Sequence, residues 1–230
     1  DVQQRRMIGD AAGIMIDDMI ADGQCIAAGW GRTLSASIKR LRPRQLRDSA
    51  VVPLMGGLMR ASETNAFDVS TELAKTLGAE CYFVTAPVYC PNAESREILL
   101  THSGVNAVMA KARQADIALV SCGDLTPGTK MTSLSSIGSV RDRLPELKKM
   151  GAVGEILGTF LDASGRPLDH FLNRCVIALP PHDLAQIPHS ILISGGVHKA
   201  GIIEAILTAG YVNCLVTDEA VAKKLVAGKK

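Results

Sequence analysis

The sequence predicts an α/β fold: a mostly parallel sheet with helices on both faces and a small antiparallel hairpin. Short apolar runs end repeatedly in a glycine-containing turn and then give way to a helical pattern. Buried parallel strands joined by crossover helices produce this pattern. The stretch 157–179 differs, because it holds two β-like halves around the turn signal of residues 162–165. Such a stretch predicts an antiparallel hairpin beside the parallel sheet.

Length and composition are those of an ordinary globular protein. The chain has 230 residues, of which 47% are hydrophobic and 21% charged, so it can bury a large core and is not disordered. No linker, composition break or constant-period repeat divides it, and residues 1–230 are expected to form one domain. The net charge is only +2. A domain that binds nucleic acid by itself usually carries a clustered basic surplus, so the whole-chain balance disfavours that function.

Three further features concern location and partners. The aromatic content of 3% leaves few platforms on which bases can stack. The six cysteines form no C-x-x-C pair, as expected for reduced, buried thiols of a cytoplasmic protein. The apolar run 51–59 is far shorter than the roughly 20 residues that span a bilayer, so no membrane partner is expected. Because the chain begins DVQQRRM without an initiator methionine or a signal peptide, we expect a piece of a longer protein.

The predicted elements follow in order along the chain. Apolar residues at three- and four-residue spacing predict an amphipathic helix from Arg5 to Ala21, and Gly23 supplies its stop. This N-terminal segment, residues 1–22, is expected to lie at an interface. Strands are expected in the runs CIAAG, SAVVPLM, ECYFVTAP, IALVSC, ILIS and NCLV. Helices are expected after GWG, around 67–77, from about 198 to Ala209 and at the C-terminus.

The first glycine-rich turn, residues 29–33 (GWGRT), suits an anion. It combines a flexible backbone, a cation and a hydroxyl at a helix start. In an open parallel sheet such turns lie at the carboxyl ends of the strands, where ligands bind. As a dinucleotide fingerprint it fails, because Leu34 replaces the third glycine and residues 50–52 offer no acidic ribose ligand. A tight turn without a ligand is an equally good interpretation of this motif alone.

The last glycine-rich turn is the strongest single signal. The strand ILIS delivers Gly195 and Gly196, whose N–H groups can approach a ligand closely, and Lys199 follows at the helix start. A binding role is favoured over a purely structural one. His198, in the same turn, is better explained as a solvated side chain than as a catalyst.

The remaining loops offer weaker candidates. The loop GDLTPGTK, residues 123–130, resembles a phosphate-binding loop, but its ending is transposed to Gly-Thr-Lys, which excludes nucleoside triphosphates. Asp124 either hydrogen-bonds a sugar hydroxyl or caps a turn. Asn65 either contacts a polyol or caps the following helix, and considered alone it is better explained as a cap. Glu155 faces either the ligand or solvent.

No pattern predicts a catalytic residue, a metal site or a cofactor. The histidines show no metal-ligand spacing with one another or with cysteine, and no G-x-S-x-G elbow is present. The run 39–47 (KRLRPRQLR) holds five basic residues in nine. It is best explained as a solvated helix end and loop, and the alternative is a surface that faces DNA or another protomer.

Five segments together carry a family resemblance, in the order GWGRTL, PLMGGL, HSGVNAVMAKARQADIALVSCGDL, GAVGEILGTFLDASGRPLD and SGGVHKAGIIEAILTAGYVNCLVTDEAVAKKL. Over nearly the whole chain the sequence resembles the effector-binding domain of the SorC family of bacterial sugar-responsive transcriptional regulators, related to part of the DeoR group. Long stretches also resemble regulators of polyol catabolism of the erythritol-responsive kind. The resemblance implies a Rossmann-like domain similar to ribose-5-phosphate isomerase and glucosamine-6-phosphate deaminase.

That resemblance also implies the partners and the site. The effector is expected to be a sugar phosphate, a polyol or a polyol phosphate. Operator DNA is expected to be contacted only through a helix-turn-helix domain preceding Asp1, and the protomers to form homodimers or homotetramers. The expected effector- or phosphate-binding residues are Gly29, Gly31, Arg32, Thr33, Gly56, Gly57, Gly195, Gly196 and Lys199, and the expected sugar-facing residues are Asn65, Gly123, Asp124 and Glu155.

Two qualifications accompany the resemblance. Many family members carry G-I-G at the end of the fourth strand, where this chain has Ser-Cys-Gly-Asp at 121–124, which points to a different effector. A sugar-phosphate isomerase or deaminase on the same fold is the alternative function. Such an enzyme needs a carboxylate base and a second acid, for which Asp124, Glu155 and His198 are the candidates, without a recognisable motif. An effector-sensing domain without enzymatic activity is therefore the favoured prediction.

Overall fold

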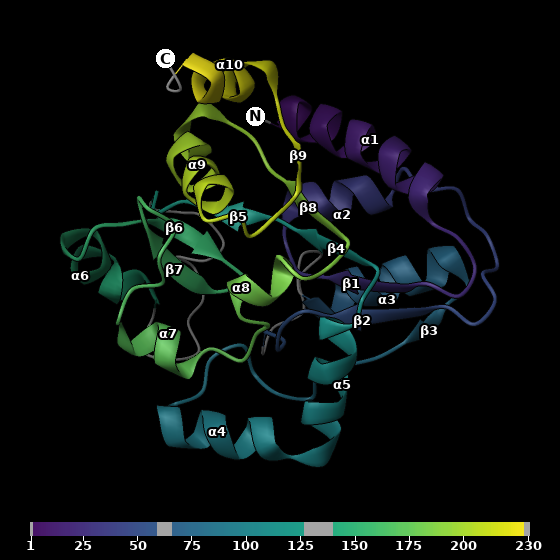
Figure 1. The fold of residues 1–230 in the computed structure, drawn as a ribbon, viewed down its shortest axis with the longest axis horizontal. Coiled ribbons are helices and arrows are strands. Elements are labelled where there is room, and N and C mark those ends of the chain that lie inside the picture. The colour runs from purple at the N-terminus through teal and green to yellow at the C-terminus, as the bar shows by residue number, and fades with distance from the viewer. Residues whose placement is uncertain (1, 59–65, 127–139, 228–230) are drawn as a thin grey trace.

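The computed structural model of the chain describes residues 2–58, 66–126 and 140–227 (Figure 1). Its first elements are α1 (Val2–Met19), β1 (Cys25–Ala28), α2 (Arg32–Ile38), β2 (Ala50–Pro53), α3 (Ala66–Leu77), β3 (Glu80–Cys81), α4 (Ala93–Thr101), α5 (Ser103–Arg113), β4 (Ile117–Val120) and β5 (Cys122–Gly123). Its later elements are η2 (Val140–Arg143), α6 (Leu144–Lys149), β6 (Ala152–Ile156), β7 (Thr159–Asp162), α7 (Phe171–Cys175), α8 (Pro181–Leu184), β8 (His189–Ile193), η3 (Val197–Lys199), α9 (Ala200–Thr208), β9 (Cys214–Val216) and α10 (Glu219–Ala227).

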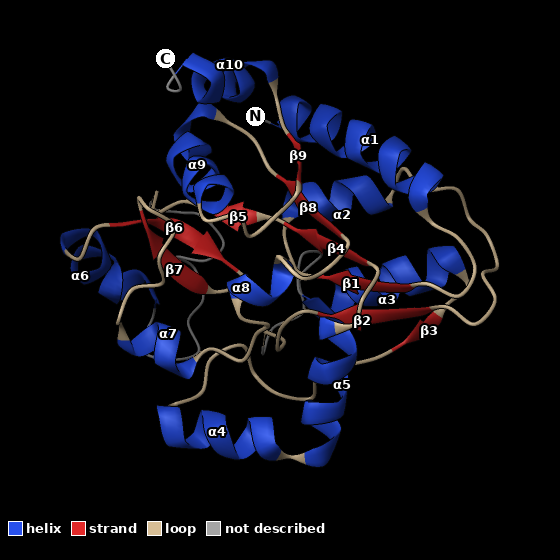
Figure 2. Ribbon diagram, viewed as in Figure 1, coloured by secondary structure: helices blue, strands red, loops and turns tan. Residues whose placement is uncertain are grey.

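A six-stranded sheet in the order β3-β2-β1-β4-β8-β9 forms the centre of the molecule, and every neighbouring pair is parallel (Figure 2). β2 and β4 are buried at every position, as expected for strands covered on both faces. The chain starts at β1, proceeds outward to β3 and then returns to β4 on the other side of β1. The predicted Rossmann-like sheet is confirmed.

The two faces of this sheet lie against two separate hydrophobic cores. Because successive side chains of a strand point to opposite faces, Ile26 and Ala28 pack in the core beneath α1, α2 and α3, whereas Ala27 packs in the other. That second core also takes side chains from α5, α9 and the small sheet. The helices on both faces thus account for the apolar, non-alternating character of the strands.

The predicted N-terminal helix is confirmed as α1, which packs closely on α2. Gly9 and Gly13 lie at the contact: a Cβ on Gly9 would be 2.6 Å from Ala36 Cβ, and one on Gly13 would be 2.6 Å from Arg40 Cβ. Side chains larger than hydrogen at these positions would push the two helices apart. The orientation of α1 about its own axis is therefore fixed by its contact with α2.

The basic run 39–47 is largely neutralised by acidic residues from and just after α1. Arg42 and Arg44 both form ion pairs with Asp17, which is buried, and Arg47 pairs with Asp22 at 2.9 Å. Burial alone would raise the pKa of Asp17, but hydrogen bonds from Arg42 and the charges of both arginines lower it below its usual range. The run follows the end of α2, and Lys39, Arg40, Arg42 and Arg47 are exposed, as expected for a solvated helix end and loop, while Arg42 and Arg44 in addition hold α1 through Asp17.

The small antiparallel sheet has the order β5-β6-β7, and its place along the chain corrects the predicted hairpin. The tight turn lies at Leu157–Gly158, between β6 and β7, and both residues have positive φ. The turn at 162–165 does form, but only residues 166–168 then pair back with β7. Part of the segment predicted as the second strand of the hairpin, residues 171–175, forms the helix α7 instead. His170 caps this helix by accepting a hydrogen bond from Leu172 N.

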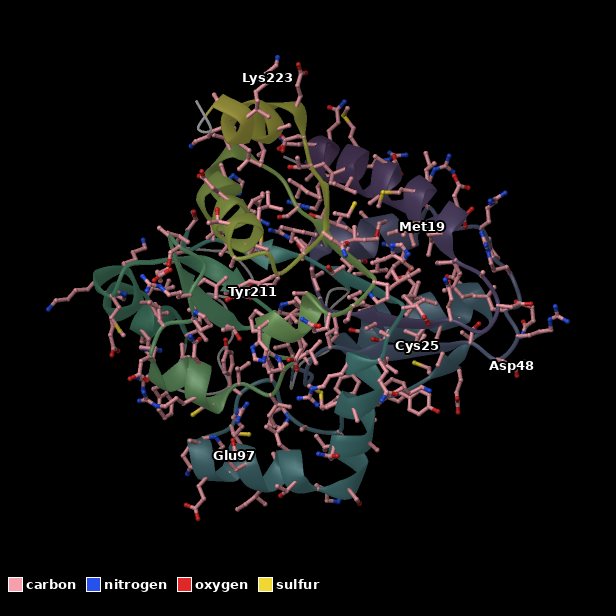
Figure 3. All side chains as sticks on the ribbon, viewed as in Figure 1. Met19, Cys25, Asp48, Glu97, Tyr211 and Lys223 are labelled. Carbon is pink, nitrogen blue, oxygen red and sulfur yellow. The ribbon has the colours of Figure 1, made fainter. Side chains whose placement is uncertain are left out.

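Two other expectations about strands are corrected. The run ECYFVTAP forms only the two-residue strand β3, and the run IALVSC divides at Ser121, so that β4 joins the large sheet and β5 the small one. Tyr211, labelled in Figure 3, connects α9 to the region of the small sheet: its hydroxyl donates a hydrogen bond to Gly165 O at 2.8 Å. The division at Ser121 matters for function, because it turns the chain at the edge where the predicted site lies.

Candidate functional site

The first glycine-rich turn lies where the strand order reverses. β1 and β4 are neighbours in the sheet. After β1 the chain continues to β2, toward one edge of the sheet, and after β4 it continues to β8, toward the other edge. Ligands of doubly wound folds bind at such a point. Gly31 begins α2 with φ of +134°, and a Cβ there would lie 3.0 Å from Ser121 Cβ. Gly31 thus allows the turns after β1 and β4 to approach closely. Gly29 N donates to Leu119 O at 2.9 Å, Thr33 is buried and Arg32 is exposed.

The last glycine-rich turn follows β8 at the same edge. Gly196 has φ of +96°, and its N–H donates a hydrogen bond to Asp218 Oδ2 at 2.7 Å. Burial would raise the pKa of Asp218, but this bond and others from backbone N–H groups at the start of α10 lower it. Sequence reasoning missed Asp218, although an Asp between an apolar strand and a helix is a recognisable cap. In this structure the Gly196 N–H is therefore already partnered by a carboxylate.

Lys199 extends from this turn to the end of the neighbouring strand. Its Nζ donates a hydrogen bond to Cys122 O at 2.9 Å. The Cys122 thiol contacts Ser194 Oγ at 3.3 Å, so two contacts join Cys122, at the start of β5, to the turn that follows β8. Burial raises the pKa of the Cys122 thiol to about 11, which keeps it protonated at neutral pH. The cation of Lys199 thus lies at the carboxyl ends of two central strands.

Two buried carboxyl groups lie in the same cluster. Glu155 is 4% exposed, and its Oε2 accepts a hydrogen bond from Gly158 N at 2.9 Å. Gly123 also donates its N–H to Glu155, and a Cβ on Gly123 would be 2.4 Å from Glu155 Oε1. Burial raises the pKa of Glu155 to about 7, with the Asp124 charge adding to the rise, while the backbone N–H donors and Lys199 oppose it. A group of this kind changes charge close to neutral pH.

Asp124 is the second carboxyl and is 5% exposed. Its Oδ2 accepts a hydrogen bond from the Thr126 hydroxyl, and within the described residues its Oδ1 has no hydrogen-bond partner. An unpartnered buried oxygen costs free energy unless a donor reaches it. Carboxylate oxygens accept bonds from hydroxyl groups, and an ammonium donates to an anion. Lys199, Glu155 and Asp124 therefore form a cluster that can recognise a ligand with hydroxyl groups and a negative charge.

The structure brings together some of the predicted residues and separates others. Gly123, Asp124, Glu155 and Lys199 gather in this cluster. Gly56 and Gly57 instead pack against other segments: a Cβ on Gly56 would lie 2.5 Å from Pro87 O, and one on Gly57 would lie 1.8 Å from the Phe67 ring. Their N–H groups donate to the backbone of Ile177 and Ala86. Close packing explains these two glycines without a ligand, and Asn65 lies outside the described residues.

Replacing Gly56 by alanine should therefore destabilise the fold itself. The new Cβ would meet the backbone carbonyls of Ala86 and Pro87, and a clash with backbone is expected to cost about 1–3 kcal/mol. Gly201→Ala is the matched control, because a Cβ at this position of α9 has nothing within 4 Å and should stabilise the helix by up to about 1 kcal/mol. Urea unfolding of both variants measures the difference, and equal stability would contradict the packing role.

Three other features of the described residues concern metal binding, the cysteines and membrane crossing. Among them, no three His, Cys, Asp or Glu side chains gather in a way that could hold a metal ion. All six cysteines, each in a described segment, are free thiols. No helix of the described chain has the length and apolar character needed to cross a membrane.

Comparison with known proteins places this architecture in a family. The model of the family described as "Putative sugar-binding domain" matches residues 1–227. The chain belongs to this sugar-binding domain family. It is 32% identical over 207 residues to the erythritol catabolism regulatory protein EryD of Brucella abortus, covering 89% of this chain. The match takes in 64% of the Brucella protein, so this sugar-binding chain spans a little under two thirds of that relative.

Solved structures of transcriptional regulators share the fold of this sugar-binding domain. A transcriptional regulator from Streptococcus pneumoniae superimposes with a TM-score of 0.91 at 26% identity, over 100% of this chain and 87% of the other. The full-length sorbitol operon regulator SorC of Klebsiella pneumoniae gives a TM-score of 0.89 at 24% identity, over 97% of this chain and 73% of the other. The predicted resemblance to the sugar-binding domains of bacterial regulators is confirmed by the family match and by EryD, and the SorC structure confirms the fold.

Proposed function

We propose that this sugar-binding chain is the effector-sensing part of a transcriptional regulator, and that its effector is a phosphorylated sugar or polyol bound at the carboxyl edge of the sheet. The observation that carries the proposal is the placement of Lys199 beside Glu155 and Asp124 where β4 and β8 end. The ammonium attracts the phosphate, and the buried carboxyl oxygens accept bonds from hydroxyl groups. Family membership and the regulator names of the relatives support the sensing role.

The remaining residues of the proposed site are the glycine-rich turns around this cluster. Gly29, Gly31, Arg32 and Thr33 lie at the end of β1, and Gly195 and Gly196 at the end of β8. An effector at this edge would compete with Asp218 for the Gly196 N–H, which offers a way for binding to alter the turn. Three further residues remain sequence predictions only. Gly56 and Gly57 have packing roles that explain them without a ligand, and Asn65 lies outside the described residues.

The regulator as a whole would act in the cytoplasm. A further domain would contact operator DNA, in agreement with the small net charge of +2 on this chain. Effector binding would change operator affinity by a coupling free energy, and DNA binding would change effector affinity by the same factor. A homodimer or homotetramer would carry the DNA-contacting domains in pairs.

A ligand panel tests the proposal and separates it from the isomerase or deaminase alternative. The 230-residue chain is incubated with tetrose, pentose and hexose phosphates and with the free polyols, and melting temperature and product are measured in the same samples. At a hundred times its dissociation constant, an effector should stabilise the chain by about 2.7 kcal/mol. Stabilisation without product is the expected result. Conversion of a sugar phosphate would establish the enzyme instead, and a panel without any melting shift would contradict the sensing role.

A further inference from the structure

Two buried cysteines from distant parts of the chain lie opposite each other. Cys90 precedes α4 and Cys175 ends α7, and both are 0% exposed. Tyr89 and Val176 form an antiparallel bridge, and Cys90 N donates a hydrogen bond to Cys175 O at 2.8 Å. Because the two segments of an antiparallel pair run in opposite directions, this bridge sets Cys90 directly against Cys175.

This pairing gives the two cysteines nearly the separation that a disulfide needs. Opposed residues joined by a backbone hydrogen bond have Cα atoms about 5.5 Å apart, and the Cα atoms of a disulfide lie about 4.4–6.8 Å apart. The Cβ atoms of opposed residues lie about 4.5–5.5 Å apart on the same side of the pair. A disulfide needs about 3.5–4.5 Å between its Cβ atoms, so a shift of about 1 Å would bring the two thiols into bonding range.

The other four cysteines lie on strands, and each is in register with a residue that is not a cysteine. The pairs in the described sheets are Cys25 with Ala50, Cys81 with Val51, Cys122 with Ile156 and Cys214 with Ile191. Cys90 differs from them, because the pKa of its thiol is raised by the charge of Cys175 in addition to the larger effect of burial. The chain therefore holds its six free thiols as one opposed pair and four separate residues.

A cation and a weakly held helix adjoin the cysteine pair. Arg96 Nε donates a hydrogen bond to Val176 O at 2.7 Å, and the guanidinium opposes the rise that burial causes in the pKa of both thiols. It thus favours the thiolate, which is the form that attacks a disulfide. The helix α4 carries Arg96 and has no buried residue, and Figure 1 shows it at the edge of the molecule. Such an element opens locally at low free energy, which gives a small oxidant access to the pair.

We infer that Cys90 and Cys175 form a reversible disulfide when the chain meets a small disulfide oxidant such as oxidised glutathione. The thiolate of one cysteine attacks the oxidant and expels one thiol, and the thiolate of the other then attacks the mixed disulfide and expels the second thiol. One S–S bond forms in the protein as one breaks in the oxidant. Two electrons pass from the protein to the oxidant, and the two protons end on the released thiols.

The disulfide would lie close to the candidate site. Tyr89, the neighbour of Cys90, donates its hydroxyl to Gly158 O at 2.6 Å, and the N–H of the same glycine donates to Glu155. A bond at Cys90 would therefore restrict a residue that contacts the turn holding Glu155. The formation of the bond does not depend on the proposed function, because it needs only the two thiols and the oxidant.

Peptide mapping of the reduced 230-residue chain after incubation with oxidised glutathione tests the inference. The remaining free thiols are alkylated, the chain is digested with trypsin without a reductant, and the peptides are identified by mass. Cleavage after Lys75, Arg96, Arg174 and Lys199 releases peptide 76–96, with Cys81 and Cys90, and peptide 175–199, with Cys175. These two peptides should appear as one cross-linked species that a reductant separates. A map in which Cys175 remains a thiol, or carries only glutathione, would overturn the inference.

Cys81→Ser is the matched control, because Cys81 shares a tryptic peptide with Cys90 but lies on β3 in register with Val51. This variant should keep the cross-link, whereas Cys90→Ala should abolish it. Circular dichroism verifies that both variants are folded. The wild-type map and Cys81→Ser decide the question even if Cys90→Ala does not fold, since a cross-link that disappears in Cys81→Ser would assign the bond to the wrong cysteine.

Asn92→Ala tests whether the oxidant enters by the opening of α4. Asn92 Oδ1 accepts a hydrogen bond from Ser95 N at 2.7 Å and so caps this helix. Loss of such a cap should increase the opening of the helix about fivefold, and the cross-link should then form about fivefold faster. Glu204→Ala, at an exposed position on α9 away from α4 (Figure 1), should leave the rate unchanged. Equal rates in the two variants would contradict entry through α4.

Discussion

A Lys199→Met variant should bind a phosphorylated sugar roughly ten- to a hundredfold more weakly than the wild-type chain, because a hydrogen bond to a charged group contributes about 1.5–3 kcal/mol. Methionine keeps the length and apolar stem of the side chain, so the loss reports the ammonium that donates to Cys122 O in the unliganded structure. Isothermal titration with the sugar phosphate that gave the largest melting shift measures the change. The matching polyol without phosphate should lose much less affinity.

Lys223→Met is the control for this experiment. Lys223 lies on α10 with an exposed side chain and pairs only with Glu219 of the same helix among described contacts (Figure 3), so its loss should leave the affinity unchanged. The melting temperature of Lys199→Met verifies that the variant is folded without its contact to Cys122. If Lys199→Met binds the sugar phosphate as tightly as the wild type does, Lys199 does not hold the phosphate.

The stability of the wild-type chain should fall as pH rises through 7, and Glu155→Gln should remove most of that fall. The pKa of Glu155 rises by burial from an ordinary value of 4.5 to about 7 in the folded chain. Between these values the folded state binds more protons than the unfolded state, so the free energy of unfolding decreases with rising pH. The contribution is fully present below pH 4.5 and lost above about 7, and the total is on the order of 3 kcal/mol.

Urea unfolding at several pH values from about 5 to about 8 measures this slope. The informative quantity is the difference in the free energy of unfolding between the wild type and Glu155→Gln at each pH. Glu204→Gln, an exposed position on α9, should retain the wild-type slope. If the stability of Glu155→Gln varied with pH in the same way as that of the wild type, the burial of the Glu155 carboxyl would not be the cause of the pH dependence.

Much of the architecture follows from local sequence. The continuous apolar runs at 25–28, 50–53 and 117–120 identify buried strands, because a strand covered on both faces needs apolar side chains on both. Once the strands are parallel, the loops after them must lie at one edge, so the cluster of Gly123, Asp124 and Lys199 was predictable. Local pattern failed at 171–175, where the His170 cap and the bonds of Asn173 to Phe160 favour a helix over a strand.

The sequence by itself determined the α/β class, the parallel sheet and the edge that carries the candidate site. The spacing of apolar residues and the residues that form turns are both properties of short segments, so they can be recognised without the tertiary structure. Only the tertiary structure decided which groups are buried together. Glu155 titrates near neutral pH because the fold of the small sheet buries it, even though the N–H groups of Gly123 and Gly158 oppose the rise in its pKa. Arg42 and Arg44 of the basic run are paired because α1 brings Asp17 to them. Burial and charge pairing depend on contacts between distant segments, and no local pattern encodes them.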